Sequence, residues 1–138
     1  QTGVEAAGIA WADVPVYECP INSQENGVRA AAALLDLDQP PTAILCMSDL
    51  LAFGAMQTAF ARGMAIPGDL SIAGFDDIPA AARSDPPLTT IRQPYAAKGN
   101  AAARFLLEGW TGDLPRRKFP TEVIWRQTTG PVRGAHGA

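Results

Sequence analysis

The sequence has very little of the side-chain chemistry that metal centres and nucleophilic enzymes use. Its 138 residues include only two cysteines and one histidine, His136, which lies in a glycine-rich tail. Cys19 and Cys46 each stand in an apolar run, which is typical of buried free thiols rather than of a disulfide or a metal pair. We therefore expect no metal site, no cofactor and no Cys-His or Ser-His-Asp catalytic arrangement.

Clustered positive charge and long apolar stretches are also missing. The eleven Lys and Arg residues are scattered and the net charge is −3, whereas DNA-binding surfaces gather cations against the phosphates. No apolar run approaches the ~20 residues that cross a bilayer, and the sequence begins with no charged and apolar leader. We expect this chain itself to bind neither nucleic acid nor membrane.

What is present is an ordinary globular composition, with 47% apolar residues, in which short apolar runs alternate with helical patterns. This alternation predicts one α/β unit, a parallel sheet flanked by helices. The run 42–47 is apolar throughout, as in a strand covered by helices on both faces. The expected strands are residues 14–19, 42–47, 70–75, 88–91 and 122–126, and the expected helices are residues 2–7, 24–37, 50–62 and 95–109.

Three further features follow from local sequence. Gly8 and Gly63 are expected to end helices, and Ser23 to begin one. The helix at residues 2–7 begins so close to residue 1 that we expect it to be the end of a longer helix. Residues 78–87 should form a loop or a broken helix, residues 128–138 a disordered tail, and all three tryptophans, Trp11, Trp110 and Trp125, should pack against other residues.

Polar residues follow the carboxyl ends of the predicted strands, where open α/β sheets bind their ligands. Asn22, Ser48, Asp76 and Gln93 each stand just beyond a strand, and Tyr95 opens the next helix. Such a group of amide, hydroxyl and carboxylate side chains suits a small polar ligand. These five residues are therefore the candidate binding site.

Several members of this group have a structural alternative. Asp49 directly precedes the apolar helix, and capping that helix is the stronger interpretation of it. Ser48 would then be available to a sugar hydroxyl, although its ligand role and its structural role are equally supported. Tyr95 either stacks on an apolar sugar face or packs into the core.

Asp76 and Asp77 resemble a paired general acid and base only at first sight. Neighbouring residues on extended chain point to opposite sides, so the two carboxyl groups cannot easily share one substrate atom. A single carboxylate that accepts hydrogen bonds from two sugar hydroxyls is the simpler chemistry. We predict a binding protein rather than an enzyme.

An ordered set of motifs resembles the effector-binding domain of transcription regulators of the lactose- and galactose-repressor type, whose core is similar to periplasmic sugar-binding proteins. The set is Pro41 to Ile44, Ser48-Asp49 with Ala52 and Gly54-Ala55, Ile66-Pro67 with Asp69, residues 70–72 (LSI), residues 74–77 (GFDD) and residues 86–94 (PPLTTIRQP). Together the motifs cover roughly residues 20 to 127.

This resemblance implies a cytoplasmic repressor that closes two lobes on a small effector, a sugar or related polyol, and binds operator DNA through an N-terminal helix-turn-helix. The chain lacks that helix-turn-helix and most of the N-terminal lobe. Residues 1–93 then correspond to the C-terminal lobe of an incomplete type I periplasmic-binding-protein-like fold. Residues 94–127 correspond to the segment that returns to the missing lobe.

The resemblance also assigns residues. Asp76 matches the ligand-gripping carboxylate, Gln93 and Tyr95 match crossover positions that touch ligand, and Ser48 stands where asparagine is common. Asn22 stands where the family often has an aromatic lid, which suggests a more polar ligand. Homodimer contacts are expected from the outer face of the helix at residues 50–62 and from the loop after Asp77, at Phe53, Gln57, Ala82 and Arg83.

Two other functions are consistent with parts of the sequence. A sugar-binding protein of a transport system shares the fold, but residues 66–94 resemble the regulators more closely and no export signal is visible. A small α/β hydrolase would need a Gly-x-Ser-x-Gly nucleophile elbow and a partner histidine, and both are missing.

Overall fold

The computed structural model describes residues 2–108 and 116–131. Helix and strand alternate from α2 to β2 and again from β3 to β4, as the pattern of apolar runs predicts, although each strand is shorter than expected. The order is α1 (Thr2–Ala6), η1 (Trp11–Asp13), α2 (Gln24–Leu35), β1 (Ala43–Leu45), α3 (Asp49–Ala61), β2 (Ser71–Ala73), β3 (Thr90–Arg92), α4 (Tyr95–Leu107) and β4 (Glu122–Ile124).

The strands form two short sheets that meet at the end of β2. β1 pairs with β2 in parallel, and β3 pairs with β4 antiparallel. Single parallel bridges from Ala73 to Thr89 and from Asp76 to Arg92 place β3 beside the carboxyl end of β2. The spatial order is thus β1, β2, β3, β4, and the predicted α/β fold class is confirmed.

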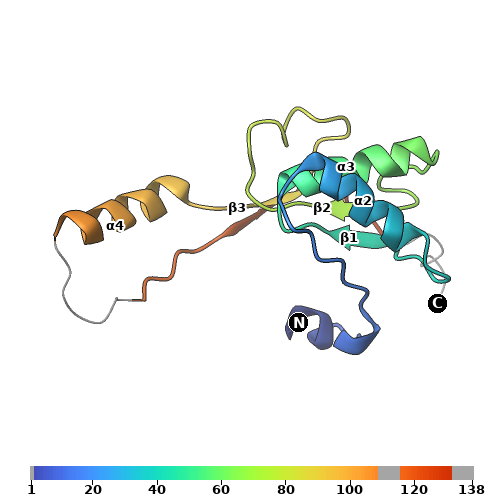
Figure 1. Cartoon of the computed structure of the whole chain (residues 1–138), viewed down its shortest axis with the longest axis horizontal. Coiled ribbons are helices and arrows are strands. Elements are labelled where there is room, and N and C mark those ends of the chain that lie inside the picture. The colour runs from blue at the N-terminus through green and yellow to red at the C-terminus, as the bar shows by residue number, and fades with distance from the viewer. Residues whose placement is uncertain (1, 109–115, 132–138) are drawn as a thin grey trace.

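The core lies between the β1–β2 pair and two helices, α2 and α3, which pack on each other (Figure 1). Contact between the helices is close because Gly27 and Gly54 carry no Cβ. A Cβ on Gly54 would stand 2.2 Å from the carbonyl oxygen of Gln24, and one on Gly27 would stand 2.3 Å from that of Leu51. The fully or nearly fully buried apolar residues include Ala31, Ala52, Ala55, Ala59, Leu70, Ile72, Ala81 and Leu88.

Strand β1 is not covered on both faces within the described residues. Ile44 and Cys46 are buried beneath the helices, but Leu45 and Met47 are 65% and 68% exposed. The uniform apolar run at residues 42–47 therefore predicted more cover than this chain supplies. The face that bears Leu45 remains open.

Residues 14–19 do not form the strand that their apolar character predicted. They lie extended beside β1 without a strand ladder, and Val16 and Tyr17 are exposed. Pro15 explains the difference, because proline has no N–H for a ladder and fixes its own φ. A single proline thus outweighs the apolar character of the run.

Beyond the core, the chain continues into an arm that consists of β3, α4 and β4. In Figure 1 the two strands run out of the core side by side and α4 lies at the far end, away from α2 and α3. Much of the arm is open to solvent: Leu106, Leu107 and Trp125 are 83%, 87% and 75% exposed. Trp125 and the exposed Trp11 are therefore not the packing residues we predicted, and Trp110 lies outside the described residues.

The chain returns from the arm into the core at Thr128, which we had predicted to begin a disordered tail. Thr128 is fully buried, and its backbone carbonyl accepts from the amide of Ile72 at 2.8 Å. Its hydroxyl donates to the carbonyl oxygen of Ile72 at 2.6 Å and accepts from the amide of Thr89 at 2.9 Å. The prediction is wrong for residues 128–131, and residues 132–138 lie outside the described residues.

Over the described ranges, no helix has the length and apolar character needed to cross a membrane.

Candidate functional site

The turn that follows β2 brings three of the five candidate residues together. Asp76 has φ +121°, a conformation that L-residues rarely adopt, and its amide donates to the carbonyl oxygen of Ile91 at 2.9 Å. Its carboxylate Oδ1 accepts from the side-chain amide of Gln93 at 2.7 Å. The hydroxyl of Tyr95 donates to the backbone carbonyl of Asp76. Asp76, Gln93 and Tyr95 thus form one cluster where β3 passes into α4.

Lys98 extends this cluster and was not among the sequence predictions. Its ammonium group donates to Oε1 of Gln93, so the Gln93 amide is held between Lys98 and Asp76. Burial raises the pKa of Tyr95, and the nearby charge of Asp76 raises it further, so the phenol remains protonated and able to donate. Lys98 lies one helical turn after Pro94, which brings it back to the helix start where Gln93 and Tyr95 lie. This helical spacing is the sequence signal that could have identified Lys98.

Asp77 has different partners from Asp76, as predicted, although the two residues lie in a turn with positive φ values rather than on extended chain. Its two carboxylate oxygens accept from two arginines, from Arg126 at 2.6 Å and from Nε of Arg92 at 2.7 Å. Burial alone would raise the pKa of Asp77, but the hydrogen bonds and charges of the two arginines outweigh it and hold the pKa below its ordinary value. Asp77 therefore remains ionised and is part of an ion-pair cluster.

Asp49 does not cap α3, contrary to our prediction. Ser48 is the N-cap: its backbone is extended and its hydroxyl accepts from the amide of Leu51 at 3.2 Å. Asp49 is the first residue of the helix, and its fully buried carboxylate accepts from the hydroxyl of Thr90 at 2.5 Å and the amide of Ile78 at 2.8 Å. The capping role predicted for Asp49 thus belongs to Ser48, which is only 3% exposed, and Asp49 is instead a buried acceptor.

The environment of Asp49 raises the pKa of its carboxyl group. Burial raises its pKa above the ordinary value, the hydrogen bonds from Thr90 and Ile78 oppose part of that rise, and the charges of Asp76 and Asp77 add to it. Gly74 makes this arrangement fit, because a Cβ there would stand 2.3 Å from Oδ1 of Asp49. Asp49, on α3, thus stabilises the turn that follows β2 through these hydrogen bonds.

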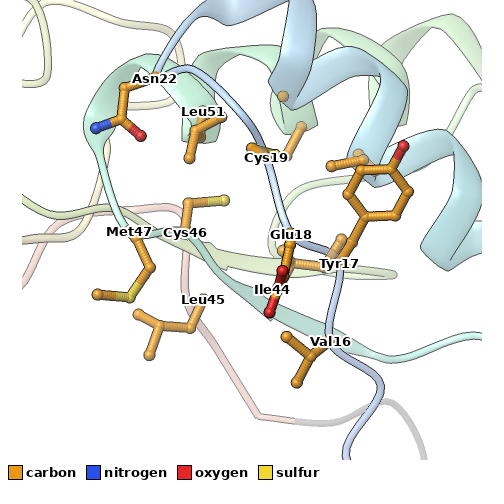
Figure 2. A pocket seen from close by; sticks show the side chains of 14 residues that line it. Val16, Tyr17, Glu18, Cys19, Asn22, Ile44, Leu45, Cys46, Met47 and Leu51 are labelled. Carbon is orange, nitrogen blue, oxygen red and sulfur yellow. The ribbon is translucent and has the colours of Figure 1, made fainter.

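Asn22 lies elsewhere, at a groove of about 400 Å³ between the extended segment of residues 16–22 and β1. Figure 2 shows this segment along one side of the groove, β1 along the other and Asn22 at one end. The groove is mainly apolar and includes both free cysteines, of which Cys46 has its pKa raised to about 12 by burial. Contacts within the described chain do not join Asn22 to the Asp76 cluster.

The Asp76 cluster has side chains suited to hydrogen bonding with a polar molecule. Within the described residues, Oδ2 of Asp76 accepts no hydrogen bond, and an ionised carboxylate is a strong acceptor for sugar hydroxyls. The same residues contain no group of three or more His, Cys, Asp or Glu side chains that could hold a metal ion. The arrangement is that of a hydrogen-bonding site beside a strand exit.

The chain is similar in sequence to one family of known proteins. The family described as "Periplasmic binding protein-like domain" matches residues 1–129. The chain is 43% identical over 116 residues to the HTH-type transcriptional regulator MalR of Streptomyces coelicolor, a match that covers 82% of this chain and 33% of MalR. It is 49% identical over 108 residues to the HTH-type transcriptional repressor CytR of Escherichia coli, covering 76% of this chain and 32% of CytR. The chain thus spans about a third of the length of these curated relatives.

A solved structure agrees with the sequence relatives. The LacI family transcriptional regulator from Enterococcus faecium, crystallised with bound ribose, superimposes with a TM-score of 0.81 at 28% sequence identity. The match covers 96% of this chain and 49% of the ribose-bound chain. The relatives are transcription regulators, and none of the three is an enzyme by name.

Proposed function

This chain belongs to the periplasmic-binding-protein-like domain family, and we propose that it is the effector-binding part of a transcription repressor that responds to a sugar or related polyol. The single observation that carries this proposal is the carboxylate of Asp76. It stands at the end of β2, is oriented by Gln93 and keeps one oxygen without a partner in the described chain. The ribose-bound relative supports a sugar as the ligand class.

The proposal includes the wider setting of such a regulator. We infer a cytoplasmic protein without enzymatic activity, which reaches operator DNA through a helix-turn-helix that is not part of this chain. The alternative, a sugar-binding protein of a transport system, is less well supported because MalR and CytR are both HTH-type regulators. Gln93 and Tyr95 are the proposed neighbours of Asp76 in the site. Ser48, which is buried and caps α3, and Asn22, which lines the groove beside β1, are more distant candidates.

A binding experiment tests the effector role. The complete polypeptide that the gene encodes is titrated by calorimetry with ribose and with a panel of neutral sugars and nucleosides. One member should bind, and Asp76→Asn should weaken that binding roughly 10- to 100-fold, because it removes a charged acceptor. Asp36→Asn is the matched control, since Asp36 pairs with Arg62 far from the cluster. An Asp76→Asn variant with unchanged affinity would remove this residue from the site.

A homodimer is proposed through the outer face of α3 and the loop after Asp77. Gln57, Ala82 and Arg83 are exposed, and Phe53 is half-buried against the core. Gln57 accepts a hydrogen bond from the side chain of Gln24 at 2.9 Å, which fixes its position on the helix surface. Sedimentation should show that Arg83→Glu weakens self-association while Arg29→Glu, on α2, does not. Equal dimer stability in both variants would move the interface elsewhere.

A further inference from the structure

Asp77 connects the two strands of the arm to the turn that follows β2. One carboxylate oxygen accepts from Arg92, the last residue of β3, and the other accepts from Arg126, which follows β4. Arg92 also lies 3.5 Å from a carboxylate oxygen of Glu122, its partner across the β3–β4 ladder. The Asp77 side chain therefore bonds to both chain segments that connect the core to the arm, at the end of β3 and after β4.

Arg126 is the more firmly placed of the two arginines. Its side chain is 14% exposed and that of Asp77 is 7% exposed, whereas that of Arg92 is 51% exposed. While one guanidinium nitrogen of Arg126 pairs with Asp77, the other donates to the carbonyl oxygen of Leu88 at 2.7 Å. The planar fork of Arg126 thus fixes the distance between the Asp77 turn and the chain that enters β3.

Asp77 shares its turn with the candidate ligand carboxylate. Asp76 and Asp77 are the two non-glycine residues with positive φ in the described chain, at +121° and +57°. Asp76 contacts Gln93 and Tyr95, and Asp77 contacts the neighbouring Arg92. The two aspartates therefore contact successive residues of the same chain segment, Arg92 and Gln93.

We propose that Asp77, together with Arg126 and Arg92, is a positioning device for the effector site. The ion-pair cluster sets where Gln93 stands relative to Asp76, and so determines how the free oxygen of Asp76 is presented to a ligand. Asp77 acts through Asp76 and Gln93 and does not itself touch the ligand. The expected effect on ligand binding rests on the proposed function. The expected effect on the position of the Gln93 side chain does not.

A purely stabilising role for the cluster makes a different prediction. If Asp77 and Arg126 only held the fold together, their loss would lower the melting temperature and leave the Gln93 to Asp76 hydrogen bond intact in the folded molecules. If they position the site, that hydrogen bond changes in molecules that are still folded. A measurement on the side-chain amide of Gln93 separates the two.

The experiment records ¹H–¹⁵N spectra of the 138-residue chain and follows the side-chain amide signals of Gln93. Asp77→Asn, which keeps the shape of the side chain, and Arg126→Met should both shift these signals toward those of exposed glutamines such as Gln39. Arg62→Met removes a similar arginine–aspartate pair at 2.9 Å far from the turn, and Leu35→Ala lowers stability from within the core. Neither control should move the Gln93 signals.

The outcomes are distinct. Unchanged Gln93 signals in folded Asp77→Asn would overturn the positioning role, even where Arg126→Met fails to fold. In the complete polypeptide, Asp77→Asn should weaken the binding of ribose, or of the panel member that binds, by roughly 2- to 30-fold. If no sugar or nucleoside binds, the proposed function fails while the Gln93 signals still decide the positioning role. If binding is present and unaffected by Asp77→Asn, the positioning role fails alone.

Discussion

The hydroxyl of Thr90 donates to the carboxylate of Asp49 at 2.5 Å, which ties the first residue of β3 to the first residue of α3. The same carboxylate accepts from the amide of Ile78, and the amide of Asp49 donates to the carbonyl oxygen of Phe75 at 2.8 Å. One buried residue thus joins the helix that follows β1 to the turn that follows β2 and to β3. These are the segments that converge on the candidate site.

Replacing Asp49 by alanine should destabilise the chain by roughly 2–4 kcal/mol, because the buried hydroxyl of Thr90 and the part-buried amide of Ile78 lose their acceptor. Asp49→Asn should cost less, since its carbonyl oxygen still accepts from Ile78 and its amide can donate to the Thr90 hydroxyl. Urea unfolding followed by circular dichroism measures both. Equal losses for the two variants would contradict the hydrogen-bonding role.

The pH dependence of stability should carry opposite signs for Asp49 and Asp77. Asp49 has a raised pKa, so its contribution is largest below the ordinary value of 3.8 and falls as pH rises toward the folded value. The advantage of the wild type over Asp49→Asn should therefore decrease with rising pH across that window. Denaturant titrations of both proteins from pH 3 upward measure it, and a constant difference would count against the raised pKa.

Asp77 has a lowered pKa, so its ion pairs stabilise the fold fully above 3.8 and this stabilisation is lost as pH falls toward the lower, folded value. The advantage of the wild type over Asp77→Asn should therefore shrink on acidification. The same titration series measures this difference. A stability difference that grows toward acid pH would have the wrong sign for a paired carboxylate.

The close contact of α2 and α3 should make Gly54 intolerant of any side chain. Gly54→Ala forces a Cβ to within 2.2 Å of a backbone oxygen of α2, and the expected loss is about 3 kcal/mol or more. Gly99→Ala is the matched control: nothing lies within 4 Å of a Cβ at this exposed helical position, and a gain of about 0.5–1 kcal/mol is expected. Thermal unfolding compares the two, and a tolerated Gly54→Ala would place the helices further apart.

The two cysteines should differ in their reaction with iodoacetamide. Burial of Cys46 raises its pKa to about 12, so thiolate is scarce at neutral pH and the sulfur is shielded, whereas Cys19 is only partly buried. Mass spectrometry after brief labelling at pH 7.5 should find the label on Cys19 first. Simultaneous labelling of both thiols in the folded chain would show that the groove opens more widely than the structure indicates.

Sequence reasoning succeeded where a local pattern and the tertiary structure agree. The apolar patterns of residues 24–37 and 50–62 predicted two helices, which the structure forms as α2 over Gln24–Leu35 and α3 over Asp49–Ala61. Ser23 caps α2 as expected, with its hydroxyl accepting from the amide of Asn26. The cluster of Asp76, Gln93 and Tyr95 is brought together as its place at strand ends suggested. Whether these residues bind a ligand stays a prediction.

The sequence-based predictions failed where a side chain's role depended on which of two neighbouring residues takes it, or on a partner far away in the sequence. Ser48 and Asp49 are both good capping residues, and only the presence of Thr90 and Ile78 beneath Asp49 decides which side chain turns back to the helix. The pairing of Asp77 with Arg126 spans 49 positions and leaves no local pattern. Thr128 was assigned to a tail by its composition, although its hydroxyl and backbone both bond to the sheet.

The return of the chain at Thr128 has a mechanical consequence for the arm. β3 and β4 leave the core together, joined along an antiparallel ladder, and each is anchored to the core at its own end, β3 beside β2 and β4 through Thr128. The arm is therefore joined to the core by two hydrogen-bonded strands rather than by a single segment of chain. Any displacement of α4 relative to the core has to carry both strands with it, so the two anchoring points share the load.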